Sequence, residues 1–171
     1  MNSYDEFVTK YIQWMMSGDR IQMGCYSPIE WPVLEPKAPV AMMFSPHPDD
    51  EILMAAPIAM RLRREGYRIV NVAMTLGRKD QRDRRAGELK RACDYIGYET
   101  FALKTEGFDS VSKKLRKSEV WLSMIDALAE FIKQTKPTVI IVHHQHDAHH
   151  EHQGTALLVR GALACVEWYG V

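Results

Sequence analysis

The sequence predicts an α/β protein: a Rossmann-like parallel sheet flanked by helices, forming a single domain behind a short N-terminal helical arm. Two observations predict this class. From residue 40 onward, short apolar runs alternate with stretches of helical periodicity. The apolar runs are nearly continuous, which is typical of strands buried on both faces. The alternation also shows no internal repeat.

The N-terminal part differs from the rest of the chain. Apolar residues recur at helical spacing across residues 3–16, and Ser3 is a candidate N-cap. Residues 17–39 contain two glycines and four prolines, which predicts an irregular segment. We therefore divide the chain into an arm, residues 1–39, and an α/β domain, residues 40–171.

Within the domain we expect four strands, at residues 40–45, 67–75, 99–103 and 138–143. We expect four helices, at about residues 51–65, 84–96, 117–135 and 153–170. Ligands of such sheets bind outside the carboxyl ends of the strands. The polar segments PHPDDE, TLGRKD and HHQHDAHHEH follow the first, second and fourth strands. The order of the elements therefore predicts one shared site at this edge.

Composition excludes several classes of protein. The 171 residues carry 22 basic and 22 acidic side chains, so a formal net charge of zero argues against nonspecific binding to nucleic acid or anionic membranes. The three cysteines are far apart and odd in number, which favours a reducing compartment. The N-terminus has no signal-peptide pattern, and no apolar run is long enough to span a membrane. We expect a soluble, cytoplasmic protein.

The turn after the first strand carries His47, Asp49, Asp50 and Glu51. The plain interpretation is an acidic first helical turn that complements the helix dipole. However, the prolines on both sides of His47 restrict the backbone. Such restriction favours a histidine side chain that is held in a fixed direction to bind a metal. A zinc hydrolase needs three protein ligands, an open position for water and a separate carboxylate as general base. Adjacent aspartates at a turn can divide two of these roles, one binding the metal and the other contacting the water.

The segment 143–152 holds six of the seven histidines. His149 and His152 are spaced i, i+3, which puts both on one face of an opening helical turn. One of them can bind a metal while the other faces substrate. The alternative is a solvated histidine-rich loop that binds transition metals adventitiously. The remaining four histidines of the segment are expected to line the rim or face solvent: His143, His144, His146 and His150.

These motifs resemble the PIG-L/LmbE-type family of zinc-dependent de-N-acetylases. The resemblance rests on SPHPDDE, followed about a hundred positions later by HHEHQGTA, and covers roughly residues 40–167. It implies that His47, Asp50 and His152 are metal ligands and that Asp49 is the general base. It also implies that His149 polarises the carbonyl or stabilises the oxyanion. The donor types favour Zn²⁺, with Fe²⁺ or Co²⁺ able to serve.

An arginine twelve residues before the glycine that ends the second helix completes the resemblance, and Arg85 stands at that interval from Gly97. Arg85 is a candidate contact for substrate or for a catalytic carboxylate; the alternative is a solvated helix residue among other arginines. The second motif departs from the family, because His150 and Glu151 replace its usual Pro and Asp. We expect Glu151 to orient His149 through a hydrogen bond.

Family members usually continue past the last helix, so this chain is either a minimal member or one whose pocket a second copy or partner completes. The expected function is hydrolysis of the N-acetyl group of an N-acetylglucosamine-type sugar or glycoconjugate, giving a free amine and acetate. The alternatives are a non-catalytic metal-containing scaffold, a metal-buffering protein and a nucleotide-binding Rossmann-like protein. The last lacks support because no G-x-G-x-x-G follows a strand.

Overall fold

The computed structural model describes residues 3–18, 29–103 and 107–166. Its strands form a four-stranded, all-parallel sheet in the order β3-β2-β1-β4, which confirms the predicted fold class. The strands are β1 (Val40–Ser45), β2 (Arg68–Ala73), β3 (Glu99–Ala102) and β4 (Val139–Ile141). The helices are α1 (Ser3–Gly18), α2 (Asp50–Leu53), α3 (Ala56–Arg64), α4 (Arg82–Ile96), α5 (Glu119–Thr135) and α6 (His150–Ala164), with 3₁₀ turns at η1 (Lys79–Gln81) and η2 (Lys113–Leu115).

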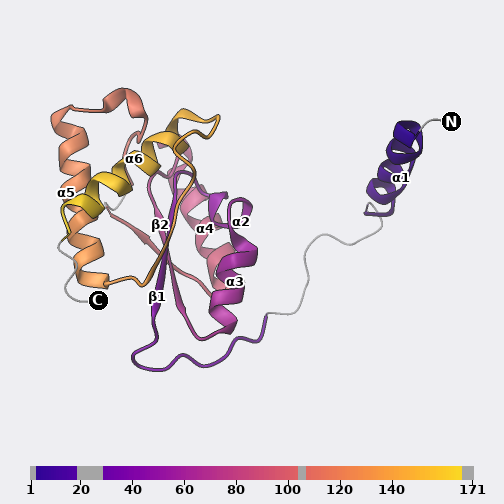
Figure 1. Cartoon of the computed structure of the whole chain (residues 1–171), viewed down its shortest axis with the longest axis horizontal. Coiled ribbons are helices and arrows are strands. Elements are labelled where there is room, and N and C mark those ends of the chain that lie inside the picture. The colour runs from indigo at the N-terminus through magenta and orange to yellow at the C-terminus, as the bar shows by residue number, and fades with distance from the viewer. Residues whose placement is uncertain (1–2, 19–28, 104–106, 167–171) are drawn as a thin grey trace.

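The sheet is covered on both faces. Helices α5 and α6 lie on one face, and α2, α3 and α4 lie on the other (Figure 1). Successive residues of β1 point to opposite faces. Met42 and Phe44 therefore enter the core beneath α5 and α6, while Ala41 and Met43 enter the core beneath α3 and α4. All six residues of β1 are buried, as its continuous apolar run predicted.

Several expected elements have other bounds in the structure. The helix predicted at residues 51–65 is two helices, α2 and α3, separated at Met54 and Ala55. Pro57 stands in the first turn of α3, where its missing N–H costs nothing, but it cannot continue a helix that arrives from Leu53. The fourth strand ends at Ile141 rather than at residue 143, so His143 belongs to the loop.

Helix α1 confirms the expected N-terminal helix, and its apolar side chains join neither core of the domain. Residues 29–39 contain no helix or strand, in agreement with the irregular segment predicted there. The last helix, predicted at residues 153–170, is α6, which begins at His150 and ends at Ala164. Residues 19–28 and 167–171 lie outside the described residues. Among the described residues, no helix combines the length and apolar character needed to cross a membrane.

The strand order places the candidate motifs together. The chain leaves β1 for β2 on one side and later adds β4 on the other side, so the strand order reverses at β1, and ligands of such sheets bind outside the carboxyl ends of the strands at this point. The HPDDE turn follows β1, and the histidine-rich loop follows β4. The two segments, about a hundred positions apart in the sequence, therefore meet at one edge of the sheet.

Candidate metal centre

The turn after β1 is held by buried polar contacts. The Ser45 hydroxyl donates to Asn71 Oδ1 at 2.6 Å, and both are fully buried. The carbonyl of Pro46 accepts hydrogen bonds from the backbone N–H and the hydroxyl of Thr75, at 3.1 and 2.8 Å. The loop after β2 therefore fixes the start of the HPDDE turn.

Asp49 has a backbone φ of 124°, a conformation that side chains rarely adopt. Its backbone N–H donates to Glu51 Oε2 at 2.9 Å, and Glu51 is 2% exposed. Burial raises the pKa of the Glu51 carboxyl. The buried Glu51 carboxylate thus stabilises the strained turn that presents Asp49.

His47 lies between two carboxylates. Its Nδ1 is 3.2 Å from Asp50 Oδ2, which also accepts the backbone N–H of His47 at 2.9 Å. Its Nε2 is 2.5 Å from Glu151 Oε2. The hydrogen bonds to Asp50 and then to Glu151 raise the pKa of His47 to about 9, and the contact with His47 lowers the pKa of Glu151 to about 2.

The contacts of Glu151 differ from the expectation. Its second oxygen accepts a hydrogen bond from the Ser110 hydroxyl at 3.0 Å, so its carboxylate contacts His47 and Ser110 rather than the His149 ring. The longer side chain of Glu reaches across to the turn after β1. His149 instead caps α6: its Nδ1 accepts the backbone N–H of Glu151 at 3.4 Å.

His152 lies in the first turn of α6 and faces the same carboxylate as His47. Its Nε2 is 3.5 Å from Asp50 Oδ1, and its Nδ1 is 3.1 Å from Asp147 Oδ1. Asp147 also accepts the backbone N–H of His149 at 2.8 Å. The carboxylate of Asp147 thus positions the start of α6 and lies close to the outer nitrogen of His152, which makes no aligned hydrogen bond within the described residues.

His143 occupies a different place from the one the sequence predicted. Its Nε2 is 3.5 Å from Asp50 Oδ1, its ring centroid is 3.9 Å from that of His152, and its side chain is 9% exposed. His144, His146 and His150 are exposed, in agreement with the prediction for them. The sequence analysis missed one signal, which is the position of His143 directly after the fourth strand. A strand that ends before residue 143 places this histidine at the carboxyl edge of β4, beside β1.

Two overlapping groups of side chains bring their potential ligand atoms within 4.8 Å of one another: His47, His149 and His152, and Asp50, His143 and His152. His47 and His152 are therefore close enough to share a cation. Imidazole nitrogens and a carboxylate oxygen are the donors that Zn²⁺ takes in catalytic sites. Of the predicted ligands, His47 and His152 share the first group, and Asp50 and His152 share the second.

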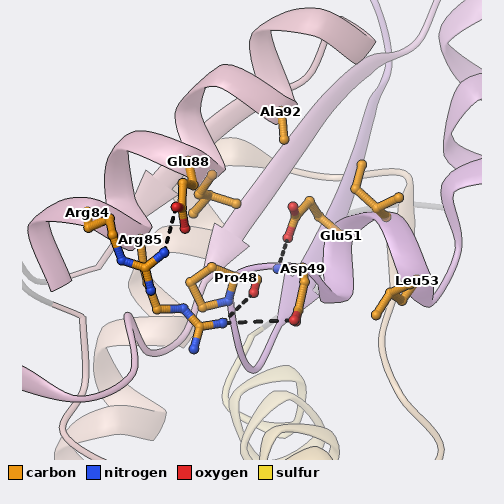
Figure 2. Close-up of a pocket in the computed structure, with 10 residues that line it drawn as sticks. Pro48, Asp49, Glu51, Leu53, Arg84, Arg85, Glu88 and Ala92 are labelled. Atoms are coloured by element: carbon orange, nitrogen blue, oxygen red, sulfur yellow. Dashed lines mark hydrogen bonds and ion pairs between the residues drawn. The ribbon is translucent and has the colours of Figure 1, made fainter. Parts of the chain in front are cut away.

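Asp49 and Arg85 line a pocket of about 440 Å³ (Figure 2). The pocket lies between the HPDDE turn and α4, and its lining also includes Glu51, Arg84 and Glu88. Arg85 Nη2 donates to the carbonyl of Pro48 at 2.7 Å and is 3.9 Å from Asp49 Oδ2. Asp49 is largely exposed, and it belongs to neither group of potential ligands.

Comparison with known proteins identifies a family and three solved structures of similar fold. The family model described as "PIG-L: GlcNAc-PI de-N-acetylase" matches residues 42–163. No curated protein matches the sequence. Solved structures of similar fold include the conserved protein TT1542 from Thermus thermophilus, with 22% identity and a TM-score of 0.59 over 72% of this chain and 55% of that chain.

Two further structures are similar in fold. GalB, the 4-carboxy-2-hydroxymuconate hydratase of Pseudomonas putida KT2440, has 18% identity and a TM-score of 0.61 over 77% of this chain and 58% of that chain. The N,N'-diacetylchitobiose deacetylase of Pyrococcus horikoshii has 14% identity and a TM-score of 0.57 over 96% of this chain and 60% of that chain. The chain spans less than two thirds of the length of each of these proteins, and at such identities the likeness concerns the fold.

Proposed function

The chain belongs to the PIG-L family of GlcNAc-PI de-N-acetylases, and from that premise we propose that it is a metal-dependent amide hydrolase. Its substrate is an N-acetylglucosamine-type sugar or glycoconjugate, and its products are a free amine and acetate. The observation that best supports this proposal is the position of the Asp50 carboxylate, which faces His47 with one oxygen and His152 with the other.

In this proposal His47, Asp50 and His152 hold the cation. Zn²⁺ suits the two imidazoles and one carboxylate best, while Fe²⁺ and Co²⁺ accept the same donors. When bound, such a cation lowers the pKa of water toward neutrality and polarises the amide carbonyl. Asp147 supports the set from behind, because its carboxylate lies 3.1 Å from the outer nitrogen of His152.

The remaining side chains handle protons and charge. Asp49 removes a proton from the attacking water and later delivers it to the leaving amine nitrogen, as the C–N bond breaks. His149 donates a hydrogen bond to the oxyanion that forms on the carbonyl oxygen. Its Nδ1 accepts the backbone N–H of Glu151, which favours the tautomer with the proton on Nε2. Arg85 keeps Asp49 in place through Pro48 and contacts substrate in the adjoining pocket.

The pocket supports a small polar substrate. Its volume of about 440 Å³ lies within the usual range for small-molecule sites. Arginines and acidic side chains in its lining offer hydrogen bonds to hydroxyl groups, and Leu53 and Leu89 offer an apolar surface. The fold alone does not select the reaction, because its structural neighbours include both a hydratase and a deacetylase.

The test is an assay for amine release from a panel of N-acetylated mono- and disaccharides by protein loaded with Zn²⁺. We expect Asp49→Asn to reduce kcat by at least about 100-fold. Asp83→Asn, an exposed aspartate in the first turn of α4, is the matched control and should retain full activity. Zn²⁺ binding without amine release from any N-acyl substrate would replace this proposal with the alternative, a non-catalytic scaffold that keeps its metal.

Replacing His47 distinguishes the proposed metal centre from the metal-buffering alternative. In a loop that binds metal through histidine content alone, His47→Ala removes little Zn²⁺. In the proposed centre, it removes the tightly bound ion, because His47 lies in the turn after β1 and outside the histidine-rich loop.

A further inference from the structure

We infer that His143 is a ligand of the bound cation, in a group with Asp50 and His152. This inference deepens the proposed function and rests on the metal centre described under it. It adds a residue that neither the motifs nor the family resemblance designated, since the HPDDE turn and the His-x-x-His segment both exclude position 143.

The environment of His143 is the first argument. Its ring is almost fully withdrawn from solvent, and within the described residues its buried Nδ1 has no hydrogen-bond partner. Its Nε2 is 3.5 Å from Asp50 Oδ1, longer than the roughly 2.7–3.2 Å of ordinary N–H···O hydrogen bonds. Burying a polar ring without good partners is unfavourable. A cation between Nε2 and Oδ1 would give these two atoms a partner, although it would not reach Nδ1.

The spacing of the donors is the second argument. Two atoms that bind Zn²⁺ tetrahedrally at about 2.0–2.2 Å lie about 3.3–3.6 Å apart. The nitrogens His143 Nε2 and His152 Nε2 are each 3.5 Å from the same oxygen, Asp50 Oδ1. Ligand atoms of all three residues also lie within 4.8 Å of one another. With His47, whose Nδ1 lies 3.2 Å from Asp50 Oδ2, these residues make four protein ligands, and Zn²⁺ can expand to a fifth position for water.

The two oxygens of Asp50 are the third argument. Oδ2 already accepts the backbone N–H of His47 and lies beside the Nδ1 of that ring. Oδ1 faces His143 and His152 instead. A cation bound to Oδ1 therefore lies beside the His143 ring, and this ring is held there by the register of β4 against β1.

The test compares Zn²⁺ and Co²⁺ binding to the whole chain, without substrate, for wild type, His143→Leu and His144→Leu. His144 is the matched control, because it is the neighbouring histidine and its side chain is exposed. Zn²⁺ affinity is measured by competition with a chromophoric chelator. The visible spectrum of the Co²⁺ form reports whether the set of ligand atoms has changed. His143→Gln provides a second variant if His143→Leu does not fold, as judged by far-UV circular dichroism.

We expect His143→Leu or His143→Gln to weaken Zn²⁺ binding by more than about tenfold and to change the Co²⁺ spectrum, and His144→Leu to do neither. Unchanged affinity overturns the inference. Weaker binding with an unchanged Co²⁺ spectrum also overturns it, because His143 would then only orient Asp50. A wild type that binds no cation overturns the inference and the metal centre together. Failure of the deacetylase proposal has a different signature, since binding would behave as expected while no amine is released.

Discussion

Gly154→Ala should destabilise the protein severely, although alanine is the better helix former. Gly154 lies in α6, two residues after His152, and is buried. A Cβ added there would lie 1.7 Å from the carbonyl oxygen of Val111 and 2.8 Å from the backbone nitrogen of Lys113. Both atoms belong to the backbone of the loop at η2, so no side-chain rotation relieves the contact. Either α6 or this loop must move by roughly an ångström or more to restore ordinary contact distances.

The magnitude follows from two opposing terms. Replacing a glycine in a helix interior by alanine gains about 1 kcal/mol of stability. Overpacking typically costs about 1–3 kcal/mol, and a clash with backbone atoms belongs at or above the upper end of that range. We therefore expect a net loss of about 2 kcal/mol or more, the difference between these two terms. A shift of α6 also moves His152 relative to Asp50, so Zn²⁺ affinity should fall as well.

The assay is urea unfolding of metal-free protein, followed by circular dichroism and compared at constant m-value. Gly87→Ala is the matched control, because Gly87 is also helical and an added Cβ would meet only the flexible end of Arg91, at 3.4 Å. That variant should gain about 0.5–1 kcal/mol. If Gly154→Ala proves as stable as wild type, the close packing of α6 against the η2 loop is refuted.

Three further predictions concern the centre itself. Asp147→Asn should weaken Zn²⁺ binding about 10- to 100-fold in chelator competition, because the carboxylate lies 3.1 Å from His152 Nδ1; unchanged affinity would contradict this role. His47 has a pKa of about 9 in the folded chain against 6.5 in the unfolded one, so its contribution to stability is complete below pH 6.5 and disappears as the pH rises through 9. Urea unfolding of metal-free wild type should show that decline and His47→Gln should not; equal slopes would disprove it. Arg85→Met loses the hydrogen bond to the Pro48 carbonyl, so it should lower kcat/KM for amine release roughly 10- to 100-fold without altering Zn²⁺ affinity, and a change confined to Zn²⁺ affinity would argue against this assignment.

Much of the fold follows from local signals. β1 was predicted with its observed bounds, Val40–Ser45, because an uninterrupted apolar run between prolines leaves few alternatives. Helix α5 begins after Ser118, whose hydroxyl caps it, and its apolar spacing was readable in the sequence. The break between α2 and α3 was missed because the apolar pattern continues across it, although Pro57 is a visible signal of the second helix.

The sequence by itself determined the alternation of strands and helices, the stiff turn carrying His47, and the expectation that this turn and the histidine-rich loop share an edge. These depend on periodicity, on proline geometry and on the general rule for parallel sheets. Tertiary structure alone decided that Glu151 contacts His47 and that His143, rather than its histidine neighbours, lies against Asp50. The physical reason is that both contacts join segments about a hundred positions apart. They depend on the register of β4 beside β1 and on the length of the side chains. A local sequence pattern encodes neither of these.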